Sequence, residues 1–205
     1  MRNLYIIFFF SVFVMQSQTK MSAANAKALQ AKVKTLAKNS KTITSDFVQY
    51  KHLDFLDNDI ETSGKMYFKA PDFVKWEYVK PFVYVVIFKE KTLYINDNGN
   101  KSKVDIGSNK MFKQLNNLVI ASVKGDLFNE EAFNISYFTF GENSLVYFNP
   151  KDEKMAKYIK SFHITFNTNG DVIEVKMIEP SNDFTRIVFT NKEINKTLPN
   201  AVFTH

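Results

Sequence analysis

From Ile43 almost to the C-terminus, the sequence is a series of short apolar and aromatic runs separated by turn residues. β-Branched and aromatic residues favour strands, and turn signals at this spacing are typical of antiparallel hairpins. The clearest turn signals are Asn98-Gly99, Gly141-Glu142-Asn143 and the segment Asn167-Thr168-Asn169-Gly170. The pattern predicts about eleven strands, at Thr42–Lys51, Ser63–Lys69, Val74–Val79, Val83–Phe88, Thr92–Asn96, Lys103–Ile106, Phe133–Phe140, Ser144–Phe148, Ile159–Asn167, Val172–Ile178 and Phe184–Thr190.

Several of these strands are apolar on more than one face. Val83–Phe88 is apolar at every position, and the chain holds 21 phenylalanines. An antiparallel sheet with one wet face would alternate cleanly between apolar and polar residues. The sheet must therefore be covered on both sides or enclose an apolar cavity. A curved sheet with helices over its concave face would leave a groove for an acyl chain, although an ordinary filled core fits the composition equally well.

Two segments have helical rather than strand periodicity. The first is Ala23–Ala37, where Ser22 can cap the helix and Leu29 and Val33 share a face with Leu36. The second begins near Ser108 and ends at Gly125, with an apolar face formed by Met111, Leu115, Leu118 and Val119. The sequence contains no repeat or linker, which predicts a single domain over residues 18–205.

The N-terminus predicts export. Arg2 is followed by an apolar run from Leu4 to Met15, which is too short to span a bilayer, and Ser17 offers a cleavage point. Residues 1–17 are therefore interpreted as a signal peptide, with an uncleaved anchor as the alternative. The chain contains no cysteine. A bacterial lipoprotein is lipidated on a cysteine after its signal peptide, so this chain is expected to be free in the periplasm.

Covalent catalysis has little support in the sequence. The chain has no cysteine and no Gly-x-Ser-x-Gly motif. A catalytic triad needs a base beside a nucleophile. The three histidines are His52, His163 and His205, and His163 alternates with large apolar residues, which favours a structural role. The net charge of +6 is interpreted first as a contribution to solubility, with attraction to an anionic membrane surface as the alternative.

Metal and cofactor sites are not predicted either. The acidic residues between the first two strands, Asp54, Asp57, Asp59 and Glu61, do not have the spacing of an EF-hand loop and fit a solvated turn. No glycine-rich phosphate loop and no nucleic-acid-binding module occurs. We therefore expect no metal, no cofactor and no nucleic acid.

The remaining candidates are apolar residues that could line a binding cavity. Methionine and phenylalanine adapt well to ligands of variable shape. The predicted lining residues are Phe47, Met66, Phe68, Phe73, Trp76, Val85, Ile87, Met111 and Leu115. Each of these residues, taken alone, could equally well belong to an ordinary hydrophobic core.

Several short motifs follow one another in a fixed order along the chain. In the first half they are Asp46-Phe47-Val48-Gln49, then Gly64–Tyr78 and Pro81. In the second half they are Leu145–Pro150, Ile187–Asn191 and Leu198-Pro199. Their order and spacing resemble the periplasmic outer-membrane lipoprotein carrier family (LolA-like), and the motifs of the first half are the strongest match. The resemblance implies a mainly β (α+β) fold, an unclosed antiparallel β-barrel of about eleven strands with helices covering the concave apolar face.

The sequence departs from the family at two positions that the resemblance links to lid control. The residue before Pro71 is Ala70, where the family often has a basic residue. Lys75 takes the basic position before Trp76, where the family has arginine, and lysine lacks the bidentate hydrogen bonding of arginine. Lys75 is the residue expected to act on a lid or partner.

The function implied by the resemblance is that of a periplasmic chaperone, not an enzyme. Such a carrier binds acylated lipoproteins, receives them from an inner-membrane ABC transporter and passes them to an acceptor at the outer membrane. It is expected to be monomeric. The alternatives are a lipid- or lipoprotein-sensing regulatory module, a carrier of another lipidic compound, and an exported hydrolase. The last would require a nucleophile–base pair near the cavity mouth.

Overall fold

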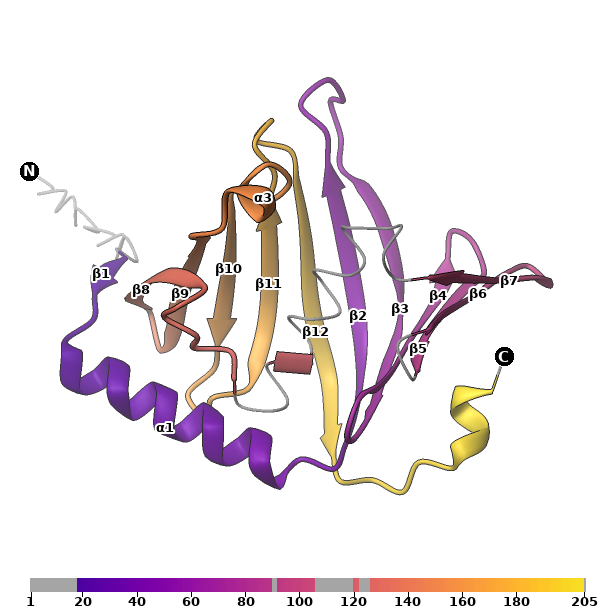
Figure 1. Ribbon diagram of the computed structural model, residues 1–205, viewed down its shortest axis with the longest axis horizontal. Helices are drawn as coiled ribbons and strands as arrows, with labels where there is room; N and C mark the ends of the chain where they lie inside the picture. The colour runs from indigo at the N-terminus through magenta and orange to yellow at the C-terminus, as the bar shows by residue number, and fades with distance from the viewer. Residues whose placement is uncertain (1–17, 90–91, 106–119, 122–125, 205) are drawn as a thin grey trace, which may run out of the picture.

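The structure, a computed structural model, describes residues 18–89, 92–105, 120–121 and 126–204 (Figure 1). The predicted signal peptide and most of the second predicted helix lie outside these residues. The described part contains a single curved sheet of twelve strands. The strands are β1 Thr19–Lys20, β2 Thr42–His52, β3 Ile60–Lys69, β4 Phe73–Lys80, β5 Tyr84–Lys89, β6 Thr92–Asp97, β7 Asn100–Asp105, β8 Phe133–Phe140, β9 Asn143–Pro150, β10 Ser161–Phe166, β11 Val172–Ile178 and β12 Phe184–Ile194.

The strand order across the sheet is β1-β8-β9-β10-β11-β12-β2-β3-β4-β5-β6-β7. Every neighbouring pair is antiparallel. The sheet is not closed, because β1 and β7 are its two edges. The pairing of the last strand β12 with β2 joins the N-terminal and C-terminal halves into one sheet. The predicted fold class, an unclosed antiparallel barrel, is confirmed.

The predicted strands differ from the observed ones mainly at their ends. The β6–β7 hairpin turns at Asn98 and Gly99, which both have positive φ angles of 47° and 95°. Asp97 pairs with Asn100 directly across this turn. β7 therefore begins at Asn100 rather than at Lys103. The twelfth strand is β1, whose two residues pair with β8 and are too few to produce a detectable sequence pattern.

The described residues also include helix α1 Ala23–Asn39, the short helix α3 Glu153–Ala156, the 3-10 helix η1 Asn200–Phe203 and helical residues 120–121. The predicted cap of α1 is observed, because the Ser22 hydroxyl accepts the Asn25 N–H at 3.2 Å. Leu29 and Val33 are buried against the β8–β11 half of the sheet. The described residues include no helix long and apolar enough to cross a membrane.

One face of the sheet, here called the inner face, carries two apolar clusters. The first lies over β9–β11 and α1: Leu29, Val33, Leu127, Val146, Phe148, Ile159, Phe162, Ile164, Phe166, Val175 and Met177. The second lies over β2–β6 and β12: Ile43, Phe47, Met66, Phe68, Val74, Trp76, Val86, Phe88, Leu93 and Ile187. Phe189 packs against both clusters. Val175 of the first cluster is the cross-strand partner of Ile187 of the second, so the two form one continuous apolar surface.

Candidate functional site: the inner face and its rim pocket

The second cluster is built around three aromatic rings. The Phe47 ring lies 5.1 Å from the Trp76 ring and 5.1 Å from the Tyr78 ring, edge to face in both cases. Trp76 is the only tryptophan of the chain and is 2% exposed. Strand alternation produces this arrangement, because Met66, Trp76 and Val86 are successive cross-strand partners and therefore point to the same face.

The structure places the predicted lining residues that it describes on two opposite faces of the sheet. Phe47, Met66, Phe68 and Trp76 belong to the inner-face cluster. Phe73, Val85 and Ile87 alternate with the inner-face residues Val74, Val86 and Phe88, so they lie on the opposite, outer face. The run Val83–Phe88 is apolar at every position and contains no alternation from which its inner face could be predicted. Met111 and Leu115 lie outside the described residues.

Lys75, predicted to act on a lid or partner, also lies on the outer face. Its Nζ is 3.2 Å from Glu77 Oε1 and 5.4 Å from the centre of the Tyr67 ring. It is the cross-strand partner of Ile87, which is on the same face. The ammonium therefore has an ion pair and an aromatic ring on the side of the sheet away from the apolar clusters.

Helical residue Ile120 packs on the second cluster from the inner side. Its neighbours in sequence fall largely outside the described residues. This contact shows that the inner face is covered at this point by a side chain from the segment between β7 and β8. An apolar ligand on this surface would compete with such contacts.

A pocket of about 440 Å³ adjoins the second cluster at the end of β3–β6. It is lined by Thr62, Tyr78, Lys80, Phe82, Tyr84 and Asp97. The Tyr78 hydroxyl donates to Gln49 Oε1 at 3.2 Å, and burial raises the pKa of Tyr78 to about 12. Thr62 Oγ1 is buried and has no hydrogen-bond partner among the described residues. Sequence reasoning missed this pocket, because its residues come from four strands and the β4–β5 turn and show no common motif.

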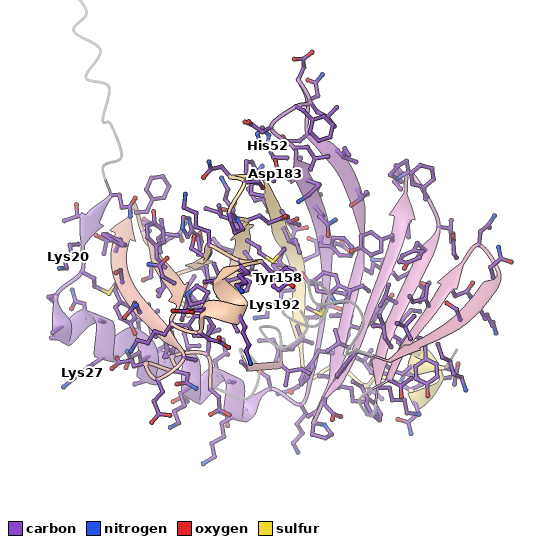
Figure 2. All side chains as sticks on the ribbon, turned by 45° about the horizontal axis from the view of Figure 1, so that its top comes forward. Lys20, Lys27, His52, Tyr158, Asp183 and Lys192 are labelled. Carbon is purple, nitrogen blue, oxygen red and sulfur yellow. The ribbon has the colours of Figure 1, made fainter. Side chains whose placement is uncertain are left out.

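The pocket lies at the edge of the sheet where the β2–β3, β4–β5, β6–β7 and β11–β12 hairpins turn, here called the rim. Figure 2 shows His52 and Asp183 together at this rim, and Lys27 on α1 at the opposite end. Large apolar side chains are exposed at two of the hairpins: Phe55 and Ile60 near the β2–β3 turn, and Val79, Phe82 and Val83 near the β4–β5 turn. Phe55 is 80% exposed and Phe82 is 74% exposed.

A hydroxyl–imidazole pair does occur in the described residues, but on the outer face. Ser161 Oγ lies 3.1 Å from His163 Nε2, and the His163 ring stacks on Tyr147 at 3.8 Å between centroids. Both residues alternate with Phe162, Ile164 and Phe166 of the inner face. The pair therefore points away from the apolar surface. An exported hydrolase that acts on a bound acyl chain would need such a pair on the apolar surface itself.

The environment of His163 should make the stability of the protein depend on pH. Burial, and to a smaller extent the nearby Lys176 ammonium, lower the pKa of His163 from 6.5 to about 4. In the window from pH 6.5 down to pH 4 the unfolded chain binds a proton that the folded protein does not, so stability is lost as the pH falls. The full shift corresponds to roughly 3 kcal/mol, and solvent screening at this half-buried site reduces our expectation to about 1–2 kcal/mol. Urea unfolding at pH 7.5 and pH 4.5 measures this loss.

His163→Gln is the matched control for this prediction, because it keeps a polar side chain and removes the titration. The difference in unfolding free energy between the two pH values should shrink by about 1–2 kcal/mol in the variant. Carboxylates with lowered pKa, such as Asp46, contribute equally to both proteins and cancel. An identical pH dependence in the wild type and the variant would show that His163 is not the responsible group.

The described residues contain no group of three or more His, Asp or Glu side chains that could hold a metal ion. At the acidic β2–β3 turn, Asp59 Oδ1 instead lies 2.8 Å from His52 Nδ1. The Asp54 N–H donates to Asp183 Oδ1 at 2.8 Å, and this hydrogen bond lowers the pKa of Asp183. The Asp183 carboxylate thus joins the β2–β3 and β11–β12 turns, whereas the Asp59–His52 pair lies within the β2–β3 hairpin.

The candidate site is thus one apolar face of an open, curved antiparallel sheet, bordered at one end by a polar pocket. The chain belongs to the outer membrane lipoprotein carrier protein LolA family, whose model matches residues 38–205. An outer-membrane lipoprotein carrier protein from Chromobacterium violaceum is 24% identical over 180 residues, which cover 88% of this chain and 84% of the relative. The resemblance identified from the motifs is confirmed.

Two solved structures are similar to this chain at low sequence identity. A DUF1329 family protein from Desulfovibrio piger aligns with a TM-score of 0.50 and 12% identity, over 87% of this chain and 97% of that protein. A LolA superfamily protein from Nitrosomonas europaea aligns with a TM-score of 0.47 and 7% identity, over 88% and 97%. At such identity the first of these similarities supports the fold alone.

Proposed function

We propose that this protein binds the acyl chains of lipoproteins on its inner face and carries them through the periplasm from the inner to the outer membrane. The observation that carries this proposal is the continuous apolar surface of an open sheet in a member of the lipoprotein carrier family. Transfer of one methylene from water to such a surface is worth about 0.8 kcal/mol. Even an acyl chain that is only partly covered by the protein would therefore bind with appreciable affinity, without a covalent bond.

The proposed route includes donor and acceptor partners. An inner-membrane ABC transporter would load the carrier, and an acceptor at the outer membrane would receive the cargo. The rim is the part of the protein at which exposed apolar side chains such as Phe55, Phe82 and Val83 are available to a partner. We place the exchange of cargo at this end of the sheet. The signal peptide predicted over residues 1–17 would deliver the chain to the compartment where this exchange takes place.

The direct test is retention of a lipoprotein in solution. The purified protein is added to inner-membrane vesicles that contain the transporter and a labelled lipoprotein, and the soluble fraction is assayed. We expect label in the soluble fraction only when the protein is present. Equal yields with and without the protein would contradict the proposal.

A pair of neighbouring substitutions tests which face holds the chain. Val86 is 1% exposed on the inner face, whereas Val85 is the next residue of β5 and lies on the outer face. Val86→Thr places a hydroxyl in the proposed acyl surface, where a bound hydrocarbon chain offers it no hydrogen-bond partner. We expect the affinity for an acylated peptide to fall severalfold, because an unpartnered buried hydroxyl is unfavourable by about 1–3 kcal/mol and part of this cost is already present in the free protein. Val85→Thr should change the affinity by less than twofold. Fluorescence of Trp76 reports binding, and circular dichroism confirms that both variants are folded.

The Val85 and Val86 variants also examine the earlier expectation that Val85 lines the cavity. If Val85→Thr weakened binding as much as Val86→Thr, the outer face would hold the ligand and the proposal for the inner face would be wrong.

A further inference from the structure

The rim pocket differs in chemistry from the apolar surface beside it. Five of its six lining residues carry a polar group, and Phe82 is the exception. Tyr78, Tyr84 and Asp97 are successive cross-strand partners across β4, β5 and β6. These three residues form a row across the sheet that begins at the half-buried Tyr78 phenol and ends at the exposed Asp97 carboxylate. A volume of about 440 Å³ lies in the range of ~300–1,000 Å³ typical of small-ligand sites.

The two charged residues of the pocket are available to a ligand. Neither Lys80 nor Asp97 forms an ion pair with another described residue. Tyr84 lies between them in the hairpin, and burial together with the Asp97 carboxylate raises the pKa of its phenol. The pocket therefore offers an ammonium donor, a protonated phenol and a carboxylate acceptor at the same time.

The pocket is continuous with the proposed acyl surface. Tyr78 and Tyr84 line the pocket and also pack against the second apolar cluster. The Tyr78 ring is 5.1 Å from the Phe47 ring and 6.0 Å from the Tyr84 ring. A hydrocarbon chain that lies along this cluster would reach the rim at these two tyrosines. Its polar end would then enter the pocket.

We propose that the rim pocket binds the polar head of an acylated peptide, the neutral segment of ester and amide groups that links the acyl chains to the polypeptide. This inference rests on the proposed function and adds a second, polar subsite to it. Ester and amide carbonyls are acceptors for the Lys80 ammonium and the Tyr84 hydroxyl, and amide N–H groups are donors to the Asp97 carboxylate. The buried Thr62 hydroxyl, unpartnered among the described residues, lies in the wall of the same pocket.

Asp97 makes the subsite selective. The carboxylate of a free fatty acid, or the phosphate of a phospholipid, would be attracted by Lys80 but repelled by Asp97. A neutral amide-containing head meets no such repulsion and gains a hydrogen bond to a charged acceptor. The pocket should therefore prefer an acylated peptide to an acyl chain with an anionic end.

The test is the Asp97→Asn variant with two ligands, a synthetic diacylated lipopeptide and palmitate, titrated by Trp76 fluorescence. Hydrogen bonds to charged groups are strong enough that we expect the lipopeptide Kd to rise about tenfold in the variant. The palmitate Kd should fall about twofold to fivefold, because a screened repulsion is removed. Opposite changes for the two ligands cannot come from a general loss of structure. Lys80→Gln should weaken the binding of both ligands.

Asp57→Asn is the matched control, because Asp57 is an exposed aspartate at the β2–β3 turn and the change in net charge is the same. It should leave both Kd values within twofold of the wild type. An apolar dye without a head group, N-phenylnaphthylamine, reports the acyl surface alone and should bind all of these proteins equally.

Three results would overturn these proposals, and they are distinguishable. If the wild type binds the dye, and Asp97→Asn changes the Kd of both ligands in the same direction or of neither, the polar subsite is wrong and the carrier proposal stands. If Asp57→Asn reproduces the effect of Asp97→Asn, the effect is one of overall charge and the subsite is again wrong. If the wild type binds neither the dye nor the lipopeptide, the proposed function itself fails.

Discussion

Replacing Trp76 with alanine is expected to lower the free energy of unfolding by about 3–5 kcal/mol. The side chain is 2% exposed and lies in the middle of the second cluster. Its ring contacts the Phe47 ring edge to face at 5.1 Å and lies 6.2 Å from the Phe189 ring. Truncation removes these contacts and leaves a cavity that strands on both sides prevent from collapsing. A domain of this kind has a total stability of roughly 5–15 kcal/mol, so the loss is a large fraction of it.

Urea unfolding followed by far-UV circular dichroism measures this loss, since the variant lacks the only tryptophan of the chain. Two control variants are compared with the loss of stability in Trp76→Ala. Trp76→Phe keeps an aromatic ring and should lose about 1–2 kcal/mol. Phe82→Ala removes a ring that is 74% exposed, and should change stability by less than about 0.5 kcal/mol. A loss below 1 kcal/mol for Trp76→Ala would mean that the inner face is loosely packed around this ring.

Replacing Gly64 with alanine is expected to destabilise the protein by about 3 kcal/mol, for a different physical reason. An ideal Cβ on Gly64 would lie 2.0 Å from the Glu77 carbonyl oxygen and 2.9 Å from the Tyr78 Cα. Both atoms are backbone, so no side-chain rotation can relieve the clash and β4 has to move away from β3. The register of these two strands shifts between Ser63 and Gly64, and the close approach accompanies this irregularity. Overpacking of this kind costs roughly 1–3 kcal/mol and occasionally more.

Gly99→Ala provides the matched control for Gly64→Ala. Apart from Gly99 and its two chain neighbours, no described residue has an atom within 4 Å of an ideal Cβ at Gly99, so only its positive φ angle of 95° opposes the substitution. We expect a loss of about 1 kcal/mol there, from backbone strain without a clash. Thermal and urea unfolding of the two variants show directly which substitution causes the larger loss of stability. A larger loss at Gly99 than at Gly64 would contradict the close approach of β3 and β4.

The Gly64 substitution also links stability to the proposed site. Tyr78, whose backbone the new methyl group would displace, lines the rim pocket and donates its hydroxyl to Gln49. Displacement of β4 would therefore disturb the junction between the polar pocket and the apolar cluster. We expect any Gly64→Ala protein that remains folded to bind an acylated peptide more weakly than the Gly99→Ala protein.

Local sequence patterns were sufficient to predict most of the strands and α1. Period-2 alternation in segments such as Phe162–Phe166 depends only on neighbouring residues, and so does the capping of α1 by Ser22. The same is true of the Asn98-Gly99 turn, whose positive φ angles these residue types tolerate. The order of motifs from Asp46 to Pro199 identified the family, because it follows the same succession of strands and turns.

The functional surface required information that local patterns do not contain. The β5 segment around Val85 and Val86 is apolar on both faces, so only its pairing with Trp76 and its neighbours in β4 assigned Val86 to the inner face and Val85 to the outer face. β1 has two residues and exists only because β8 offers it an edge. The rim pocket combines residues from 62 to 97 that are unrelated in sequence and meet through strand register.

Thus the sequence alone determined that the chain forms an open antiparallel sheet with an N-terminal helix and belongs among the lipoprotein carriers. The tertiary structure decided which apolar residues share the inner face, and it placed a polar pocket at one end of that face. The physical reason is that strand formation depends on residues a few positions apart, whereas the face and the register of each strand are set by partners distant in sequence.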